Sequence, residues 1–169
     1  VAKAHNAHIL LATDPDADRL GAMIPDDQGG WRYVNGNEIA AISTCFKLEM
    51  MAQNKKLTPK SIVVKTEVTT GMISRIAKHF NVQVLDDLLV GFKYVSEVLW
   101  QLESTGKYSH VTGAPSDFVI ASEESHGILS TDQIRDKDAG AAALLFAEWA
   151  LYLFRNNTTT LKYLNQLFE

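Results

Sequence analysis

The sequence predicts a layered α/β domain in which helices cover a sheet, preceded by a pair of strands that belongs to another domain. From about residue 35 onward, short apolar runs typical of strands alternate with stretches whose apolar residues recur at helical spacing. Residues 1–34 contain two strand-like runs and no helix of their own, which is too little chain to form a domain. We therefore expect two parts, with residues 1–34 as the end of one domain and residues 35–169 as the next domain.

The first part is predicted as strand, loop, strand and turn. His8–Thr13 is an apolar run that stops at a cluster of aspartates. Leu20–Ile24 is a second run, and it stops at the turn-forming sequence Pro25–Gly30. The chain begins at Val1 and not at a methionine, so we expect it to be a piece of a longer protein.

Helices in the second part are predicted from capping residues and from apolar spacing. Side chains of residues 35–38 can cap a helix that runs to about Met51. Thr69 or Thr70 can cap another helix, whose apolar face reaches Phe80. The remaining helices are predicted at residues 92–102, 138–154 and 161–168.

Strands alternate with these helices. The predicted strands are Ser61–Lys65, Val82–Leu85 and Phe118–Ala121, and the first contains the β-branched run expected of a buried strand. The polar stretch Glu103–Pro115 is predicted to be a surface loop. The alternation favours helices packed on a sheet.

The composition is that of a soluble globular protein. The chain is 46% hydrophobic and 21% charged, with a formal net charge of -4. Because lysines and arginines are scattered singly, we expect no nucleic-acid partner. No segment approaches the roughly 20 consecutive apolar residues of a membrane span, so we expect no membrane association. The only cysteine, Cys45, lies in an apolar-periodic stretch, which favours a buried structural thiol and fits a reducing cytoplasm.

Three aspartates follow the first predicted strand at alternating positions, Asp14, Asp16 and Asp18. Carboxylates this close repel one another unless a cation neutralises them, and Mg²⁺ is the hard cation that best fits such oxygen ligands. Arg19 adds a planar donor group suited to a phosphate. The loop therefore predicts a magnesium site for phosphoryl chemistry.

The aspartate loop is also compatible with a solvated acidic turn, because Asp and Pro are ordinary turn formers. A calcium-binding EF-hand loop is excluded, since it would require Gly and Glu where the sequence has Arg19 and Pro25. A phosphatase of the haloacid dehalogenase type remains a distant alternative, because an acid follows where that class has Thr or Val.

From the aspartate loop onward, the sequence resembles the α-D-phosphohexomutases, the superfamily of phosphoglucomutase and phosphomannomutase. Residues 14–19 resemble the metal loop of that family. The segments that match its third domain, its active-site lysine, its Gly-aromatic-Lys turn, its sugar-binding loop and its next charged segment follow in that order: Gly36–Glu38, Val64–Thr66, Gly91–Lys93, Ser122–Gly127 and Arg135–Gly140.

The resemblance implies a fold and a division of the chain. Residues 35–169 would be a three-layer α/β/α domain with a mixed sheet, of the phosphoglucomutase domain III type. Residues 1–34 would be the C-terminal part of domain II and would include the metal-binding loop.

The resemblance also implies roles for single residues. Asp14, Asp16 and Asp18 would bind Mg²⁺, and Arg19 and Lys65 would be catalytic. The substrate-binding candidates are Glu123, Ser125, Lys93, Lys137 and His126.

The loop after the last predicted strand contains the main sugar-binding candidates. Glu123 and Ser125 are two positions apart in an extended loop and so point the same way. In the family these two residues hold two ring hydroxyls. Glu124 points elsewhere and is expected to position the loop. For His126 an ordinary loop role is the alternative, and for Lys65 a solvated position at the end of a strand.

The family reaction moves a phosphoryl group from a phosphoserine to a hexose phosphate and passes through a bisphosphate. The chain has no match to the Ser-His nucleophile of the family's first domain or to the phosphate-binding loop of its last domain. We therefore expect the chain alone to be inactive, with the remaining domains of the same enzyme and a hexose phosphate as its partners. The alternatives are a stand-alone sugar-phosphate binding module and a Mg²⁺-dependent phosphatase.

Overall fold

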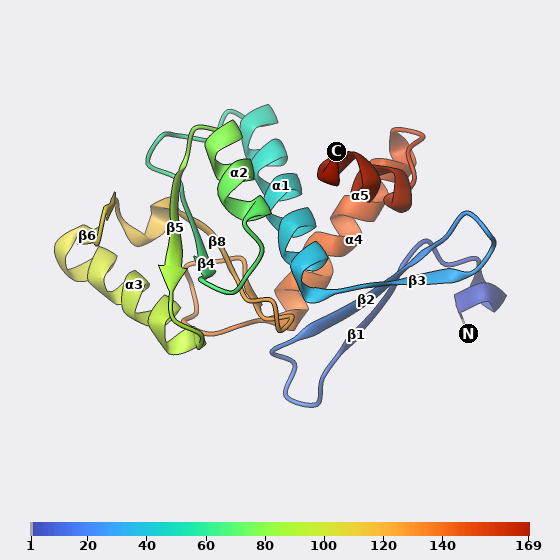
Figure 1. Ribbon diagram of the computed structural model, residues 1–169, viewed down its shortest axis with the longest axis horizontal. Coiled ribbons are helices and arrows are strands. Elements are labelled where there is room, and N and C mark those ends of the chain that lie inside the picture. Colours follow the sequence, from blue (N-terminus) through green and yellow to red (C-terminus); the bar gives the residue numbers. More distant parts are fainter. Residues whose placement is uncertain (1) are drawn as a thin grey trace.

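The computed structural model describes residues 2–169, and its N-terminal part is a three-stranded antiparallel sheet that lies beside an α/β unit (Figure 1). The strands are β1 (Leu10–Thr13), β2 (Leu20–Pro25) and β3 (Trp31–Val34), preceded by a short 3-10 helix, Ala2–His5. The sequence predicted two strands in this part, and the structure adds a third, β3. Asp26 closes the turn by accepting hydrogen bonds from the N–H groups of Gln28 and Gly30, and this turn brings β3 back onto β2.

The second part contains a four-stranded mixed sheet in the order β5-β4-β8-β9. Its strands are β4 (Ile62–Thr66), β5 (Gln83–Leu88), β8 (Phe118–Ser122) and β9 (Ile128–Leu129). The strands β5, β4 and β8 are parallel, and β9 is antiparallel to β8. Because parallel strands end at the same edge of a sheet, the residues that follow β4, β5 and β8 lie together.

Helices cover both faces of this sheet, so the predicted three-layer α/β/α fold is confirmed (Figure 1). Alternate residues of β4 point to opposite layers: Val63 belongs to the core under α1, α2 and α4, whereas Ile62 and Val64 belong to the core under α3. The helices are α1 (Gly36–Gln53), α2 (Met72–His79), α3 (Phe92–Thr105), α4 (Ala139–Arg155) and α5 (Thr160–Phe168).

Two helix starts follow from their capping residues. The Asn35 side chain accepts a hydrogen bond from the Glu38 N–H, and the Glu38 carboxylate accepts one from the Asn35 N–H, which forms a capping box at α1. The Asp138 carboxylate accepts hydrogen bonds from Gly140 and Ala141 at the start of α4.

The stretch predicted to be a surface loop contains more structure than expected. Helix α3 continues to Thr105 and ends at Gly106, which has a φ of 71°. A short hairpin of β6 (Lys107–Tyr108) and β7 (Val111–Thr112) follows, with Val111 fully buried. Two-residue strands are too short to produce a readable alternation, which is why the prediction missed them.

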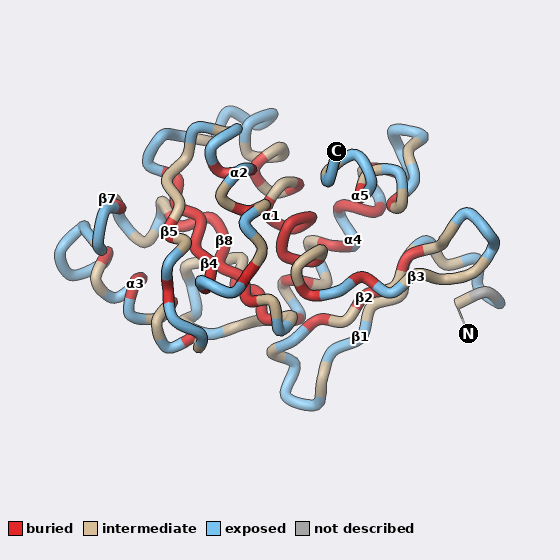
Figure 2. The backbone as a smooth tube through the Cα atoms, in the orientation of Figure 1, coloured by how far each residue is buried: buried red, intermediate tan, exposed pale blue. Residues whose placement is uncertain are grey.

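The larger core is shared by the two parts of the chain. It contains side chains of β2 and β3, and it continues through α1, α2, α4, α5 and the sheet. Figure 2 shows the buried residues running from the central sheet through α1 and α4 to β2 and β3. The contributors from the N-terminal sheet are Leu20, Ala22, Ile24 and Val34. Among residues 2–169, no helix has both the length and the apolar character needed to cross a bilayer.

Candidate metal and sugar-phosphate site

The aspartate loop joins β1 to β2 and is folded around Asp14. One oxygen of the Asp14 carboxylate accepts hydrogen bonds from the N–H groups of Asp18 and Arg19, both at 3.1 Å. Its other oxygen accepts from Arg19 Nε at 2.6 Å. These bonds curl the loop so that oxygen atoms of Asp14, Asp16 and Asp18 all lie within 4.8 Å of one another.

Asp14 is the electrostatic anchor of this loop. The hydrogen bond from the Arg19 N–H, together with the Arg19 guanidinium, lowers the pKa of Asp14 to about 2. The same contact with Asp14 raises the pKa of Arg19. Asp14 is therefore a carboxylate over the whole physiological pH range, and the Arg19 side chain stays 55% exposed.

The aspartate loop is held against the second part of the chain. The backbone N–H of Leu20 donates to the His126 carbonyl at 3.2 Å, and Arg19 forms a β-bridge with Gly127. On its other side, the Ala139 N–H donates to the Ala17 carbonyl at 3.0 Å. The loop after β8 and the start of α4 thus fix the aspartate loop from two directions.

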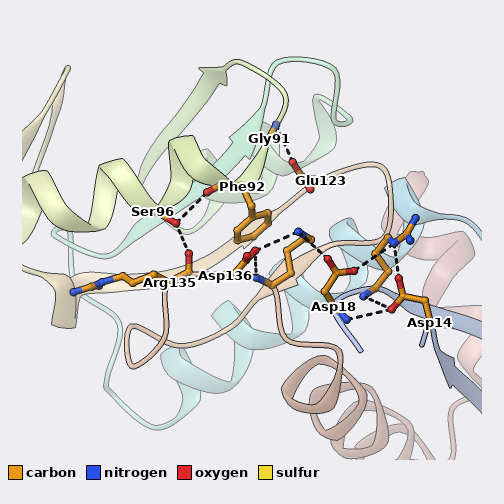
Figure 3. Close-up of polar contacts among 10 residues, drawn as sticks. Asp14, Asp18, Gly91, Phe92, Ser96, Glu123, Arg135 and Asp136 are labelled. Atoms are coloured by element: carbon orange, nitrogen blue, oxygen red, sulfur yellow. Dashed lines mark hydrogen bonds and ion pairs between the residues drawn. The ribbon is translucent and has the colours of Figure 1, made fainter. Parts of the chain in front are cut away.

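Glu123 lies at the centre of the loop after β8 and is 5% exposed. Its Oε1 accepts a hydrogen bond from the Gly91 N–H, at the turn before α3, at 3.1 Å (Figure 3). Burial raises the pKa of Glu123, while this N–H and the nearby Lys137 ammonium act in the opposite direction. Oε1 of Glu123 thus has a partner in Gly91, and Oε2 remains available to a ligand.

Ser125 and His126 share an open hollow of about 360 Å³ with the aspartate loop, where Asp14, Arg19 and Tyr33 also form the wall. Ser125 is exposed. His126, in contrast, uses both ring nitrogens within the protein. Nδ1 donates to the Leu20 carbonyl at 2.9 Å, and Nε2 accepts from the Tyr33 hydroxyl at 2.8 Å. His126 therefore links the loop after β8 to β2 and β3.

The two lysines predicted near the ends of β4 and β5 lie apart from this hollow. Lys65 is buried, and its Nζ donates to the carbonyls of Thr66, Thr69 and Asp86 at 3.0, 3.0 and 3.1 Å. Burial lowers the pKa of Lys65, and Asp86 opposes that effect. Lys93 is exposed, and its ammonium lies 5.0 Å from the centre of the Tyr94 ring.

Lys137 contacts the aspartate loop directly. Its Nζ lies 3.0 Å from Asp18 Oδ2 and 3.2 Å from Asp136 Oδ1. Burial alone would lower the pKa of Lys137, but these two carboxylates outweigh it and raise the pKa. The structure thus places Lys137 between the predicted metal ligands and Glu123.

Four further residues support the site: Thr66, Thr69, Gly36 and Tyr33. None of them was predicted from the sequence to have a role in the site. The Glu124 carboxylate accepts from the hydroxyls of Thr66 and Thr69, both at 3.4 Å, and the Glu124 N–H donates to Thr69 at 3.1 Å. These contacts agree with the positioning role expected for Glu124. Gly36 and Tyr33 approach the same loop from α1 and β3. Thr69 and Tyr33 belong to no motif, so only the fold could reveal their contacts with this loop.

The aspartate loop fits a divalent metal. Its donor set consists only of oxygen atoms, which Mg²⁺ prefers. Asp18 Oδ1 is buried and accepts no aligned hydrogen bond from the described residues, although Arg19 Nε lies 3.3 Å away. Asp16 is exposed, and its carboxylate makes no ion pair among residues 2–169. Unused acceptor capacity of this kind suits a cation.

The fold and the order of the loops define the class of this protein. Residues 35–169 match the family model described as phosphoglucomutase/phosphomannomutase, alpha/beta/alpha domain III. The chain belongs to the phosphoglucomutase/phosphomannomutase family, within the α-D-phosphohexomutases.

Relatives agree with this membership. A phosphomannomutase of Mycoplasma genitalium is 32% identical over 169 residues, and a phosphoglucomutase of Staphylococcus saprophyticus is 32% identical over 164 residues. These matches cover 99% and 97% of the chain, but only 28% of each relative, so the chain spans little more than a quarter of their length.

Two solved structures share the fold. The crystal structure of a Thermus thermophilus protein described as a phosphomannomutase has a TM-score of 0.67 at 21% identity, and the match covers 94% of the chain and 30% of that protein. An Aspergillus fumigatus N-acetylphosphoglucosamine mutase, solved in complex with GlcNAc-6P and magnesium, has a TM-score of 0.56 at 18% identity. That match covers 92% of the chain and 34% of the mutase.

Proposed function

We propose that the chain supplies the metal-binding loop and the sugar-recognition loop of a phosphohexomutase. The complete enzyme would interconvert hexose 1-phosphates and hexose 6-phosphates by phosphoryl transfer, through a phosphoserine and a bisphosphate. The observation that carries the proposal is the direct contact between the aspartate loop and the loop after β8, through Leu20 with His126 and through Arg19 with Gly127. Phosphoryl transfer to a sugar requires these two groups of residues to be held together.

Residues 1–34 and 35–169 would accordingly be the end of domain II and domain III of that enzyme. The partners of the chain would be a hexose phosphate and the remaining domains, which contain the nucleophile and the phosphate-binding loop. A related mutase was crystallised with GlcNAc-6P and magnesium, which supports this chemistry for the class.

On the phosphate side, Asp14, Asp16 and Asp18 would hold Mg²⁺. When bound, the ion would neutralise charge on the phosphoryl group. Arg19 Nε donates a hydrogen bond to Asp14. The side chain is exposed, so its terminal amino groups remain available to a phosphate. The arginine would thereby orient the phosphate beside the metal.

On the sugar side, Glu123 would accept a hydrogen bond from a ring hydroxyl with Oε2, because Oε1 is held by Gly91. Ser125 is exposed in the shared hollow and would serve a second hydroxyl. Lys65 donates to three carbonyls, so a direct role in proton transfer would require it to leave them. We therefore assign it the role of shaping the end of β4 and adding positive charge there.

Two measurements on the purified chain test the proposal. The first is Mn²⁺ uptake, followed as the loss of the free-ion signal in electron paramagnetic resonance. Asp16 is exposed and accepts no hydrogen bond in the described part, so Asp16→Asn should lower Mn²⁺ affinity at least about tenfold without disturbing the fold. Asp27→Asn removes an equal charge from an exposed turn and is the matched control. Equal affinity in the two variants would place the metal elsewhere.

The second measurement is turnover at high protein concentration. The chain should convert no glucose 1-phosphate, because the nucleophile would come from another domain. Clear turnover would overturn the fragment assignment. Release of inorganic phosphate with Mg²⁺ would indicate a phosphatase, and tight binding of a hexose phosphate in calorimetry would indicate a stand-alone binding module.

A further inference from the structure

We propose that Lys137 is a built-in counter-cation of the aspartate loop, which binds the same carboxylate as the divalent metal and therefore competes with it. This inference rests on the metal site proposed above. It gives Lys137 a role toward Asp18, in place of the direct sugar contact implied by the family resemblance.

The ammonium group of Lys137 is placed firmly beside Asp18. Its Nζ lies 3.0 Å from Asp18 Oδ2 and 3.2 Å from Asp136 Oδ1. The side chain of Lys137 is only 17% exposed and that of Asp18 is 27% exposed, so water screens this ion pair less than a pair on the open surface. The attraction between Lys137 and Asp18 is therefore stronger than that of a fully exposed ion pair.

The aliphatic part of Lys137 is fixed by its neighbours. Its ammonium lies 5.2 Å from the centre of the Phe92 ring, within the range of a cation–π contact. The stem passes directly over Gly127, where an added Cβ would overlap Lys137 Cδ. The Lys137 N–H also donates to Asp136 Oδ1 at 2.8 Å. These contacts aim the ammonium at the aspartate loop before any ligand binds.

Lys137 and a divalent metal would compete because both are cations that use the Asp18 carboxylate. Arg19 is paired with Asp14 and lies 3.3 Å from Asp18 Oδ1, Lys137 is paired with Asp18 and Asp136, and Asp16 has no cationic partner in the described part of the chain. With Asp136 included, the four carboxylates and two cations carry a formal charge of -2. A divalent ion bound to Asp18 would repel the ammonium that lies 3.0 Å from the same carboxylate, and this repulsion is the source of the competition. Arg19 is bound to Asp14 through both its backbone N–H and Nε. The Lys137 ammonium has a second carboxylate, Asp136, at 3.2 Å and can leave Asp18 while keeping that partner, so we take Lys137 as the group that moves.

The displaced ammonium has another acceptor close by. The Cβ that would overlap the Lys137 stem at Gly127 would also lie 3.0 Å from Glu123 Oε2. The stem of Lys137 and the free oxygen of Glu123 thus face the same glycine. Metal binding at Asp18 would thereby turn Lys137 from the aspartate loop toward the sugar loop.

The test compares Mn²⁺ affinity of the whole chain and of Lys137→Met by the loss of the free-ion paramagnetic signal. Removing the competing ammonium should tighten Mn²⁺ binding about threefold to tenfold. Lys78→Met is the matched control. Lys78 is exposed in the last turn of α2, so this substitution removes the same charge outside the aspartate loop. Its affinity should stay within about twofold of the unmodified chain. Lys137→Arg, which keeps the charge, should also bind no more tightly than the unmodified chain.

Each outcome decides the proposal. Weaker binding by Lys137→Met would show that the lysine positions Asp18 for the metal, and unchanged binding would show that it has no part, so either result overturns the inference. If neither the unmodified chain nor Lys137→Met takes up Mn²⁺, the metal site itself is wrong. A second measurement avoids substitution altogether: Mg²⁺ added to the unmodified chain should shift the ¹³Cε resonance of Lys137, and a resonance that stays in place while metal binds would contradict displacement.

Discussion

At the scale of single residues, most charged or polar side chains of the site already have a partner from the chain itself. His126 is an example, since one ring nitrogen donates to the Leu20 carbonyl and the other accepts from the Tyr33 hydroxyl. Both bonds would have to break before the ring could contact a sugar. Of the two roles considered for this residue, the contacts favour the structural one, and we propose that the ring positions the loop that carries Ser125.

Cys45 illustrates how burial sets the chemistry of a residue. The thiol lies in α1 beside Glu49 and Tyr163, and burial raises the pKa of Cys45 to about 12, whereas the Tyr163 hydroxyl works in the opposite direction. At pH 8 the thiolate, which is the reactive form, is therefore much rarer in the native chain than in the unfolded one.

We predict that iodoacetamide alkylates Cys45 at pH 8 at least about 100-fold more slowly in the native chain than in urea, because the reactive thiolate is rare. Since the folded pKa is raised, the native rate should keep climbing above pH 9 instead of levelling off. Mass spectrometry of timed samples measures both rates. Native labelling as fast as that of a free thiol would show that the buried environment is wrong.

At the scale of elements, the loop after β8 is positioned by the start of α1. A Cβ built at Gly36 would lie 2.7 Å from the backbone carbonyl carbon of Glu124 and 3.0 Å from the backbone nitrogen of His126. It would overlap the backbone carbonyl oxygen of Glu124. Backbone atoms cannot move aside as a flexible side chain can. The glycine is therefore needed for close approach, and the start of α1 and the loop after β8 form one packed unit.

We predict that Gly36→Ala destabilises the chain by about 1–3 kcal/mol, because the added methyl forces the loop away from α1. Gly71→Ala is the control, since its added Cβ would meet open space and its φ of -65° suits alanine. Urea unfolding followed by circular dichroism gives both stabilities. If the two variants lose equal stability, the close approach of α1 to the loop does not exist.

At the scale of the whole molecule, the two parts of the chain share one hydrophobic core. Leu20, Ile24 and Val34 of the N-terminal sheet are fully buried together with Phe146 and Trp149 of α4. At roughly 1.5–3 kcal/mol for each large apolar side chain removed from water, separating the sheet from the helices would cost several kcal/mol. The aspartate loop is thus carried on a sheet that cannot easily move relative to the loop after β8.

We predict that residues 1–34 and 35–169 unfold in a single transition, because neither part can expose its share of the core alone. Trp31 in β3 reports on the first part once Trp100 and Trp149 are replaced by phenylalanine. In that variant, the urea midpoint from Trp31 fluorescence should match the midpoint from far-ultraviolet circular dichroism. A lower midpoint for Trp31 would mean that the N-terminal sheet detaches first.

The sequence by itself determined the fold class, most of the elements and the residues of both loops, because these depend on local patterns. The aspartates at alternate positions, the β-branched run of β4 and the capping residues of α1 and α4 are all readable within a few residues. The short hairpin after α3, the strand β3 and the strand β9 were missed. The hairpin strands and β9 have two residues each, which is too few to show a period, and β3 is defined by its pairing with β2.

Only the tertiary structure decided which side chains meet. Tyr33 and His126 are 93 residues apart in the sequence, and Lys137 reaches Asp18 across the boundary between the two parts of the chain. No periodicity or motif encodes such pairs, because they arise when the sheet of residues 10–34 packs against α1 and α4. The sequence therefore determines the ligands that the site offers, whereas the shared core decides which of them are already paired with another residue.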